Sequence, residues 1–155
     1  MIEIRKATKK DVNEICKIND ELADYHTRID SYYSPAKNVR KSFKDKLVKR
    51  INKKDFLILV AVDKNKIVGY FVSEIIESKE YKVEKKIGYI HTAYITENYR
   101  RMGLGNEMYD LTKFWFKKNK IKYVELTVDS RNKIGNSAWN KIGFEEYMKK
   151  MKLKL

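Results

Sequence analysis

Two kinds of apolar spacing divide the first third of the chain. Apolar and polar residues alternate over residues 2–8, which predicts a half-buried strand. Apolar residues then recur every three or four positions over residues 9–28, which predicts a helix. The segment 26–38 breaks that spacing and holds the only proline, Pro35, after which helical spacing returns over residues 39–51. One strand followed by two helices is therefore expected.

The middle of the chain has the patterns of strands. Residues 55–76 predict two strands that form a hairpin around the turn at residues 63–66, whose sequence is DKNK. The first of these strands is an unbroken apolar run, which indicates burial of both its faces. A further strand is expected over residues 86–96.

The last third changes between helical and alternating patterns. Helical spacing over residues 103–120 is followed by alternation over residues 122–128, a short helix through Trp139 and a last strand within residues 145–155. This order predicts a mixed α/β sheet, of the α+β kind, with helices on its faces. No linker composition separates the pieces, so one domain over residues 1–155 is expected. The residues of the helix at 103–120 that we expect in the core are Met108, Leu111, Thr112, Phe114 and Trp115.

Composition indicates the expected partner and location of the protein but does not indicate a reaction. The 35 Lys and Arg against 21 Asp and Glu give a formal net charge of +14, which favours an anionic partner such as nucleic acid, an acidic protein or a phosphorylated cofactor. The lone cysteine, Cys16, is expected to be a buried apolar residue. No run of roughly eighteen apolar residues and no signal-peptide pattern is present, so we expect a cytoplasmic protein without a membrane segment.

The sequence YRRMGLGN at residues 99–106 suggests a binding site. Gly103 and Gly105 lie between an expected strand and an expected helix, where free N–H groups and the helix dipole favour an anion such as pyrophosphate. A dinucleotide fingerprint would need a third glycine at Met108, and a P-loop would need Lys and then Ser or Thr after Gly105. The alternative is a tight turn without a ligand.

The same residues resemble the signature of a family. Arg100-x-x-Gly103-x-Gly105 resembles the acetyl-CoA signature of the GNAT N-acetyltransferase superfamily, Arg/Gln-x-x-Gly-x-Gly/Ala. A later segment is similar too, because Asn132 precedes a short helix that ends in Gly-Phe at residues 143–144. With the order of elements, the resemblance covers essentially the whole chain.

The resemblance implies a fold and a cofactor. The fold would have a central, mostly antiparallel sheet that splays between its fourth and fifth strands, with helices on both faces. The cofactor would be acetyl-CoA (coenzyme A), with its pyrophosphate on the loop N–H groups and its pantetheine arm along the fourth strand. The cofactor-binding residues expected on this basis are Tyr94, Ile95, Arg100, Arg101, Met102, Gly103, Leu104, Gly105, Asn106, Asn132 and Trp139.

The reaction that the resemblance implies is transfer of the acetyl group to a primary amine by direct attack of the deprotonated amine. His91 lies four residues before Ile95, where some relatives have a glutamate base, and histidine can accept a proton near neutral pH. Glu74 is the alternative base, acting through a water. For each, the alternative is an ordinary surface side chain.

The general acid is less well marked. Many family members use a tyrosine at the position of Trp139, and an indole N–H donates hydrogen bonds but is not an acid at neutral pH. Tyr94, Tyr147 on the expected last strand, or solvent remain as proton donors. This substitution also keeps open a second function, a non-catalytic acyl-CoA-binding regulator.

The acceptor site is expected where the first two helices meet. Tyr25, His26, Asp30 and Tyr33 are the residues that we expect to line it, for an amine of a small molecule or of a peptide N-terminus or lysine. No metal is expected. A basic nucleic-acid-binding domain is a third function, but the basic segments at residues 37–54 and 116–122 look like solvated helix faces, so nucleic acid is not the expected partner. The last strand could pair with a second copy to form a homodimer.

Overall fold

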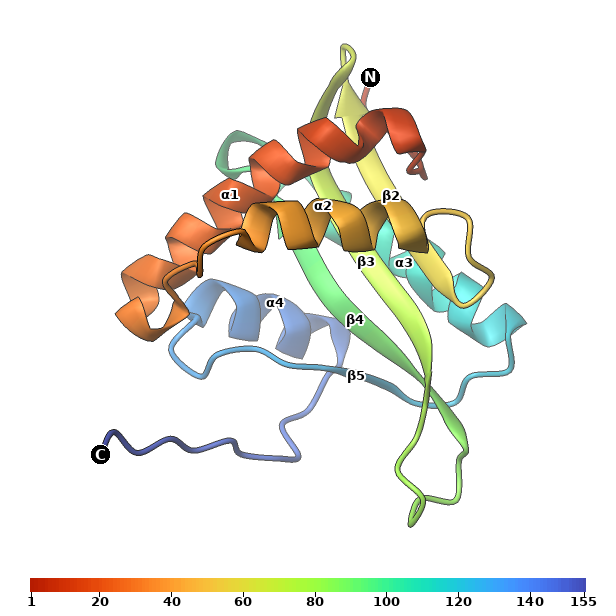
Figure 1. Cartoon of the computed structure of the whole chain (residues 1–155). Helices are drawn as coiled ribbons and strands as arrows, with labels where there is room; N and C mark the ends of the chain where they lie inside the picture. Colours follow the sequence, from red (N-terminus) through yellow and green to blue (C-terminus); the bar gives the residue numbers. More distant parts are fainter.

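The computed structural model describes residues 1–155 as one sheet with helices on both sides (Figure 1). The strands are β1 (Glu3–Lys6), β2 (Phe56–Asp63), β3 (Lys66–Glu77), β4 (Lys86–Ile95) and β5 (Val124–Leu126). The α-helices are α1 (Val12–Ile29), α2 (Val39–Arg50), α3 (Leu104–Lys118) and α4 (Lys133–Ile142), and short 3-10 helices lie at Lys9–Asp11, Ser31–Tyr33 and Glu97–Tyr99. Every expected element except the last strand is present.

The strands follow one another across the sheet in the order β1-β2-β3-β4-β5. All neighbouring pairs are antiparallel except β4 and β5, which are parallel. The parallel pair is short, because Gly88–Ile90 alone pairs with Val124–Leu126. The rest of β4, residues 91–95, has no strand partner on that side. The expected mixed, mostly antiparallel sheet that splays between its fourth and fifth strands is confirmed.

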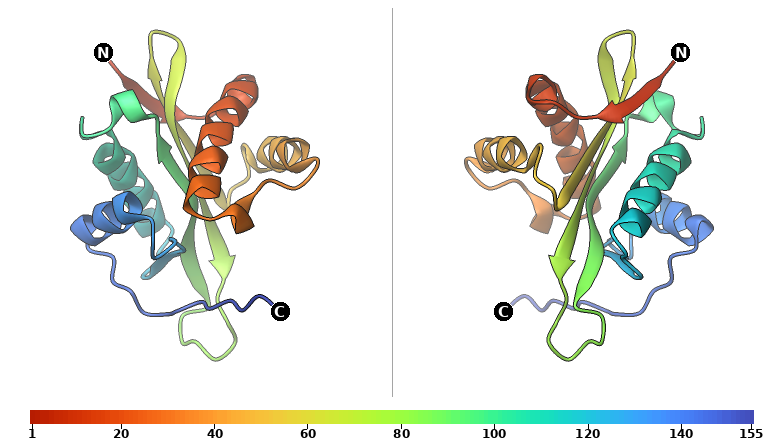
Figure 2. Two further views of the ribbon diagram at one scale, coloured as in Figure 1. Left: turned by 90° about the vertical axis from the view of Figure 1, so that its left-hand side faces the viewer. Right: turned by 90° about the vertical axis from the view of Figure 1, so that its right-hand side faces the viewer.

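Each face of the sheet packs against its own helices, with α1 and α2 on one side and α3 and α4 on the other (Figure 2). The apolar run of β2 alternates between the two cores. Ile58 and Val60 belong to the core under α1 and α2, whereas Leu57, Leu59 and Ala61 belong to the core under α3. The expected burial of both faces of β2 is therefore confirmed. Cys16 is also buried, as expected.

The buried stripe of α3 differs from the expected one. Its buried residues are spaced by four, at Leu104, Met108, Thr112 and Phe116. Leu111 and Phe114 are 45% and 68% exposed, so the expectation that they lie in the core was wrong. Trp115 is half-buried beside the same core. An α-helix has 3.6 residues per turn, so residues spaced by four lie along one side of it. Positions 111 and 114 lie outside this buried stripe and face solvent.

Residues 145–155 do not form the expected last strand. They are exposed and have no regular secondary structure. An alternating sequence becomes a strand only where another strand supplies hydrogen bonds, and no strand pairs with this segment. It crosses the end of the sheet from the α4 side to the α1 side (Figure 2), where Lys152 forms an ion pair with Asp30. Tyr147 lies on this irregular segment with its ring 5.7 Å from the Lys82 ammonium, and not on a strand as expected.

Candidate active site

The point at which β4 leaves β5 defines the centre of the candidate site. Pairing with β5 ends at Ile90, and β4 continues alone on that side from His91 to Ile95. A short 3-10 helix and a loop then lead into α3. The splay therefore leaves an open strand edge next to the glycine-containing loop, and such an edge can accept an extended ligand through backbone hydrogen bonds.

The loop before α3 presents a run of free N–H groups. Gly103 is the N-cap of α3 with a φ of 84°, a left-handed conformation that glycine adopts without strain. None of the backbone N–H groups from Arg101 to Gly105 donates a hydrogen bond within the protein, whereas the Asn106 N–H donates to the Gly103 carbonyl at 3.0 Å. A Cβ added at Gly103 or Gly105 would meet no atom within 4 Å, so space is open above both. Free donors at a helix N-terminus suit a bound anion.

The side chain of Arg100 turns away from this loop. Its Nε donates to the Ile95 carbonyl at 2.9 Å, and its guanidinium carbon lies 5.5 Å from the centre of the Tyr94 ring. Arg100 therefore ties the loop to the end of β4 and is not free to bind a phosphate through Nε. Arg101 remains exposed beside the free N–H groups, with a φ of 62°.

Helix α1 reaches the splay through two side chains one turn apart. The Tyr94 hydroxyl donates to Glu21 Oε2 at 3.3 Å, and burial, followed by the charge of Glu21, raises the pKa of Tyr94. The Tyr25 hydroxyl donates to Asn132 Oδ1 at 2.9 Å, and the same oxygen caps α4 by accepting from the Gly135 N–H at 2.9 Å. The Asn132 oxygen is thus occupied within the protein, and its amide nitrogen is left as the free donor.

The expected acceptor-site residues gather where the end of α1 meets the connection from β5 to α4. The Tyr33 hydroxyl donates to Asp129 Oδ2 at 2.8 Å, a bond that raises the pKa of Tyr33. The His26 ring lies 5.9 Å from the Tyr25 ring and 5.8 Å from the Tyr33 ring, and burial lowers the pKa of its imidazole.

Asp30 is the fourth of the expected acceptor-site residues. Asp30 forms one ion pair with Lys152 and another with Arg131, and the latter has a length of 3.0 Å. Both interactions lower the pKa of Asp30, and the hydrogen bond from Lys152 has the larger effect. The structure therefore brings together all four residues that the sequence suggested for the acceptor site.

The two candidate bases are in contact. His91 Nε2 lies 2.6 Å from Glu74 Oε2. The register between β3 and β4 shifts at this place, because Val72 pairs with Thr92 and Ser73 with Ile90. His91 is therefore the extra residue of a β-bulge, which redirects its side chain. The His91 ring lies 4.9 Å from the Tyr89 ring and 6.4 Å from the Phe56 ring.

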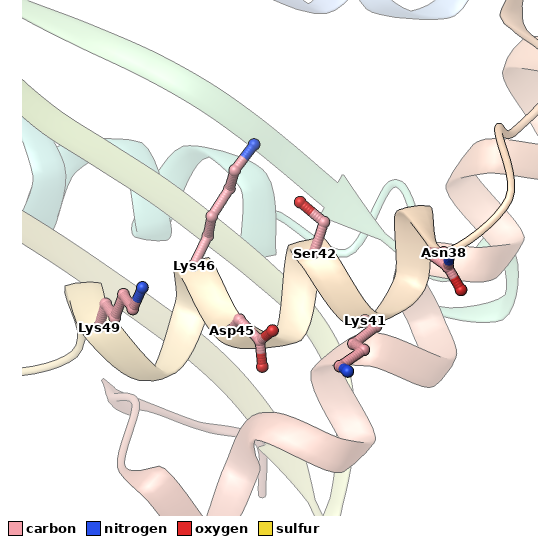
Figure 3. Close-up of a pocket in the computed structure, with 6 residues that line it drawn as sticks. All are labelled: Asn38, Lys41, Ser42, Asp45, Lys46 and Lys49. Carbon is pink, nitrogen blue, oxygen red and sulfur yellow. The ribbon is translucent and has the colours of Figure 1, made fainter.

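Two further features were considered as parts of the site, the ring of Trp139 and a depression along α2. The ring of Trp139 packs against Phe71, Tyr109 and Phe144 at 5.3 to 6.4 Å, in the apolar layer on the α3 side. A surface depression runs along α2, but its side chains point in several directions rather than toward one centre (Figure 3). Its lining residues are Asn38, Lys41, Ser42, Asp45, Lys46 and Lys49.

Two functional contacts were not predicted from the sequence. The pairing of Glu21 with Tyr94 and that of Tyr25 with Asn132 both join α1 to distant segments. The four-residue spacing of Glu21 and Tyr25 was the available signal, since it puts both on one helix face. No group of three or more His, Cys, Asp or Glu side chains is arranged to hold a metal ion. None of the helices is long and apolar enough to span a bilayer.

Comparison with known proteins identifies the family. The Acetyltransferase (GNAT) family matches residues 17–144, and no curated protein matches the chain in sequence. The tetramutant of the BH1408 protein from Bacillus halodurans has a TM-score of 0.87 at 20% identity, with 99% of each chain covered. A predicted acetyltransferase from Clostridium acetobutylicum, solved with acetyl-CoA, has a TM-score of 0.79 at 20% identity, covering 99% of this chain and 96% of that chain. An aminoglycoside antibiotic 6'-N-acetyltransferase from Acinetobacter haemolyticus has a TM-score of 0.77 at 14% identity, covering 99% and 97%. These solved structures have the same fold as this chain. The family match covers most of the chain, and it shows that the chain belongs to the GNAT family of acetyltransferases.

Proposed function

We propose that the protein is an acetyl-CoA-dependent N-acetyltransferase that acts on a primary amine. The observation that carries the proposal is the run of free N–H groups from Arg101 to Gly105, at a helix N-terminus directly after the splayed strand. These donors fit a pyrophosphate, and the open edge of β4 at Tyr94 and Ile95 fits an extended amide-containing arm. The free amide nitrogen of Asn132 supplies a further donor for that arm.

The residues at the splay then have separate roles. Bound acetyl-CoA supplies the acetyl group as a thioester, whose C–S bond breaks as the new C–N bond forms. His91 takes a proton from the ammonium form of the acceptor, and the neutral amine that results attacks the thioester carbon. Glu74 holds the imidazole in place. The Tyr94 hydroxyl returns a proton to the departing sulfur. Its raised pKa keeps that hydroxyl protonated at neutral pH, and water is the other source of this proton.

The acceptor would enter on the face of the sheet that carries α1 and α2. Glu74, His91 and Tyr94 all contribute side chains to that face. Tyr25, His26, Asp30 and Tyr33 border it at the end of α1. Solved structures with this fold include aminoglycoside acetyltransferases, so aminoglycosides belong in the panel of amines to be tested.

The decisive test is calorimetric titration of acetyl-CoA into the protein and into two variants of Gly105. Gly105 is helical, so glutamate fits its backbone conformation but brings bulk and negative charge to the free N–H groups. We expect Gly105→Glu to weaken binding at least about 100-fold, since a charged hydrogen bond is lost and replaced by repulsion. Gly105→Ala is the matched control and should retain binding, because the family signature accepts alanine there.

Two outcomes would contradict the proposal at different levels. No binding of acetyl-CoA by the intact protein would mean that residues 99–106 form only a turn. Saturable binding without thiol release for any amine of a broad panel would instead support the alternative, a regulator that binds acyl-CoA. Trp139, in the position of the usual tyrosine, is the feature that favours this alternative.

A further inference from the structure

The guanidinium of one arginine on the acceptor side of the sheet has no hydrogen-bond or ion-pair partner. Arg50 ends α2 and is half-buried, and its guanidinium carbon lies 4.9 Å from the centre of the Phe56 ring. It makes no hydrogen bond or ion pair with any side chain or carbonyl of the protein. Arg101, beside the free N–H groups, is the other arginine without such a partner. The remaining arginines donate to Asp11 (Arg5), the Asp24 carbonyl (Arg28), Asp20 (Arg40), the Ile95 carbonyl (Arg100) and Asp129 (Arg131).

Phe56 places this guanidinium next to the proposed base. Phe56 pairs with Glu74 across β2 and β3, so their side chains share a face of the sheet. The Phe56 ring stacks on the His91 ring at 6.4 Å with an interplanar angle of 17°. Arg50, Phe56 and His91 therefore follow one another along the same face, with Glu74 beside them. Beyond α2, the lower part of this face is not covered by a helix (Figure 1).

No carboxylate forms an ion pair with Arg50, although Asp55 precedes Phe56 and Glu74 faces Phe56 across the sheet. Residues 37–54 contain nine lysines and arginines and a single acidic residue, Asp45. A guanidinium presents donors in a planar fork that fits a carboxylate with two parallel hydrogen bonds. A half-buried fork that is already fixed against an aromatic ring loses little conformational freedom when it binds such a group.

We propose that Arg50 binds a carboxylate of the acetyl acceptor, so that the acceptor is an amine that also carries a carboxylate rather than a polycationic amine. This inference rests on the proposed function and adds a substrate class to it. The acceptor amine would lie at His91 and its carboxylate at Arg50, with the Phe56 ring beneath the part that joins them.

The experiment compares matched pairs of amines, each an amine with a single carboxylate and its carboxamide, such as 4-aminobutyrate and 4-aminobutanamide. We expect kcat/KM, measured by thiol release, to favour the acid of a pair by roughly 10-fold or more. Arg50→Gln should abolish this preference, and Arg50→Lys should keep only part of it, because lysine retains the charge without the fork. Arg40→Gln is the control on the same helix and should leave the preference unchanged.

A second measurement does not depend on turnover. The pair 4-aminobutyrate and 4-aminobutanamide is titrated calorimetrically into the protein saturated with coenzyme A, and into its Arg50→Gln variant. Tighter binding of the acid that disappears in Arg50→Gln supports the inference even if no amine is acetylated, in which case the proposed function fails alone. Turnover with equal kcat/KM for acid and amide, or a preference that survives in Arg50→Gln, overturns the inference while the proposed function stands. Stronger binding of a phosphate-bearing amine such as phosphoethanolamine than of any carboxylate also overturns it.

Discussion

The contact between His91 and Glu74 decides which nitrogen of the imidazole can take up a proton. A carboxylate only accepts hydrogen bonds, so Nε2 of the neutral ring donates to Glu74 at 2.6 Å and Nδ1 is left as the acceptor. Glu74 then stabilises the imidazolium that forms when Nδ1 is protonated. In the proposed mechanism the pair therefore supplies one base, His91, and one positioning residue, Glu74, where the sequence offered two alternative bases.

This arrangement predicts unequal effects of mutating the two residues. His91→Gln removes the proton acceptor, and we expect kcat to fall by about 10²- to 10⁴-fold with an unchanged Kd for acetyl-CoA. Glu74→Gln keeps a hydrogen-bond partner for the ring and should lower kcat less. A kcat that falls no further in His91→Gln than in Glu74→Gln would contradict the role of His91 as base.

At the scale of elements, the junction between β1 and α1 depends on one buried carboxylate. Asp11 accepts hydrogen bonds from both terminal nitrogens of Arg5 at 2.8 Å and from the Thr8 N–H at 2.6 Å. The bond with Arg5 is the main cause that lowers the pKa of Asp11 from 3.8 to about 2. Because the folded pKa is the lower one, this contribution to stability is present above about pH 4 and disappears as the pH falls toward 2.

Replacing this carboxylate should therefore cost stability only where it is ionised. Asp11→Asn is expected to lower the free energy of unfolding at neutral pH by about 2 kcal/mol and by roughly half as much near pH 3. Urea unfolding at both pH values measures the difference. Asp45→Asn is the control, because Asp45 is exposed and has no ion pair. An equal loss for Asp11→Asn at both pH values would mean that packing and not charge is responsible.

The elements that local sequence determines were predicted, and those that depend on distant partners were not. The DKNK turn was predicted because four polar residues separate two apolar strand patterns. In the structure Lys64 and Asn65 of this turn have φ of 45° and 68°. The segment 145–155 has an equally regular alternation, but no strand edge reaches it, so the pattern alone gave a wrong strand. The contact of Glu74 with His91 depends on the bulge in β4, and no residue near His91 marks a bulge in the sequence. Exposed Phe114 shows the same limit, since helical spacing does not say which stripe the sheet will cover.

At the scale of the whole molecule, the free N–H groups of the loop and the candidate catalytic side chains lie on different parts of the sheet. The free N–H groups before α3 lie at the end of the splay where we propose that the cofactor binds, and the side chains of Glu74, His91 and Tyr94 lie on the face of α1 and α2. Arg100 joins the two, because it begins the loop and holds the end of β4. The splay is therefore the one place where a ligand on the loop can meet an amine from the other face.

The net charge of +14 predicts how the stability of the whole molecule responds to salt. Most of the lysines of α2 are exposed and unpaired, so their mutual repulsion opposes folding most when screening is weak. The Debye length falls from about 30 Å to about 10 Å between about 0.01 M and 0.1 M salt, so the free energy of unfolding should rise over this range, by on the order of 1 kcal/mol. The double variant Lys41→Glu and Lys46→Glu removes positive charge from two exposed positions of α2 and should show a smaller rise. Urea unfolding at the two salt concentrations measures both. A fall in stability with salt would mean that the surface ion pairs, such as that of Arg40 with Asp20, outweigh the repulsion.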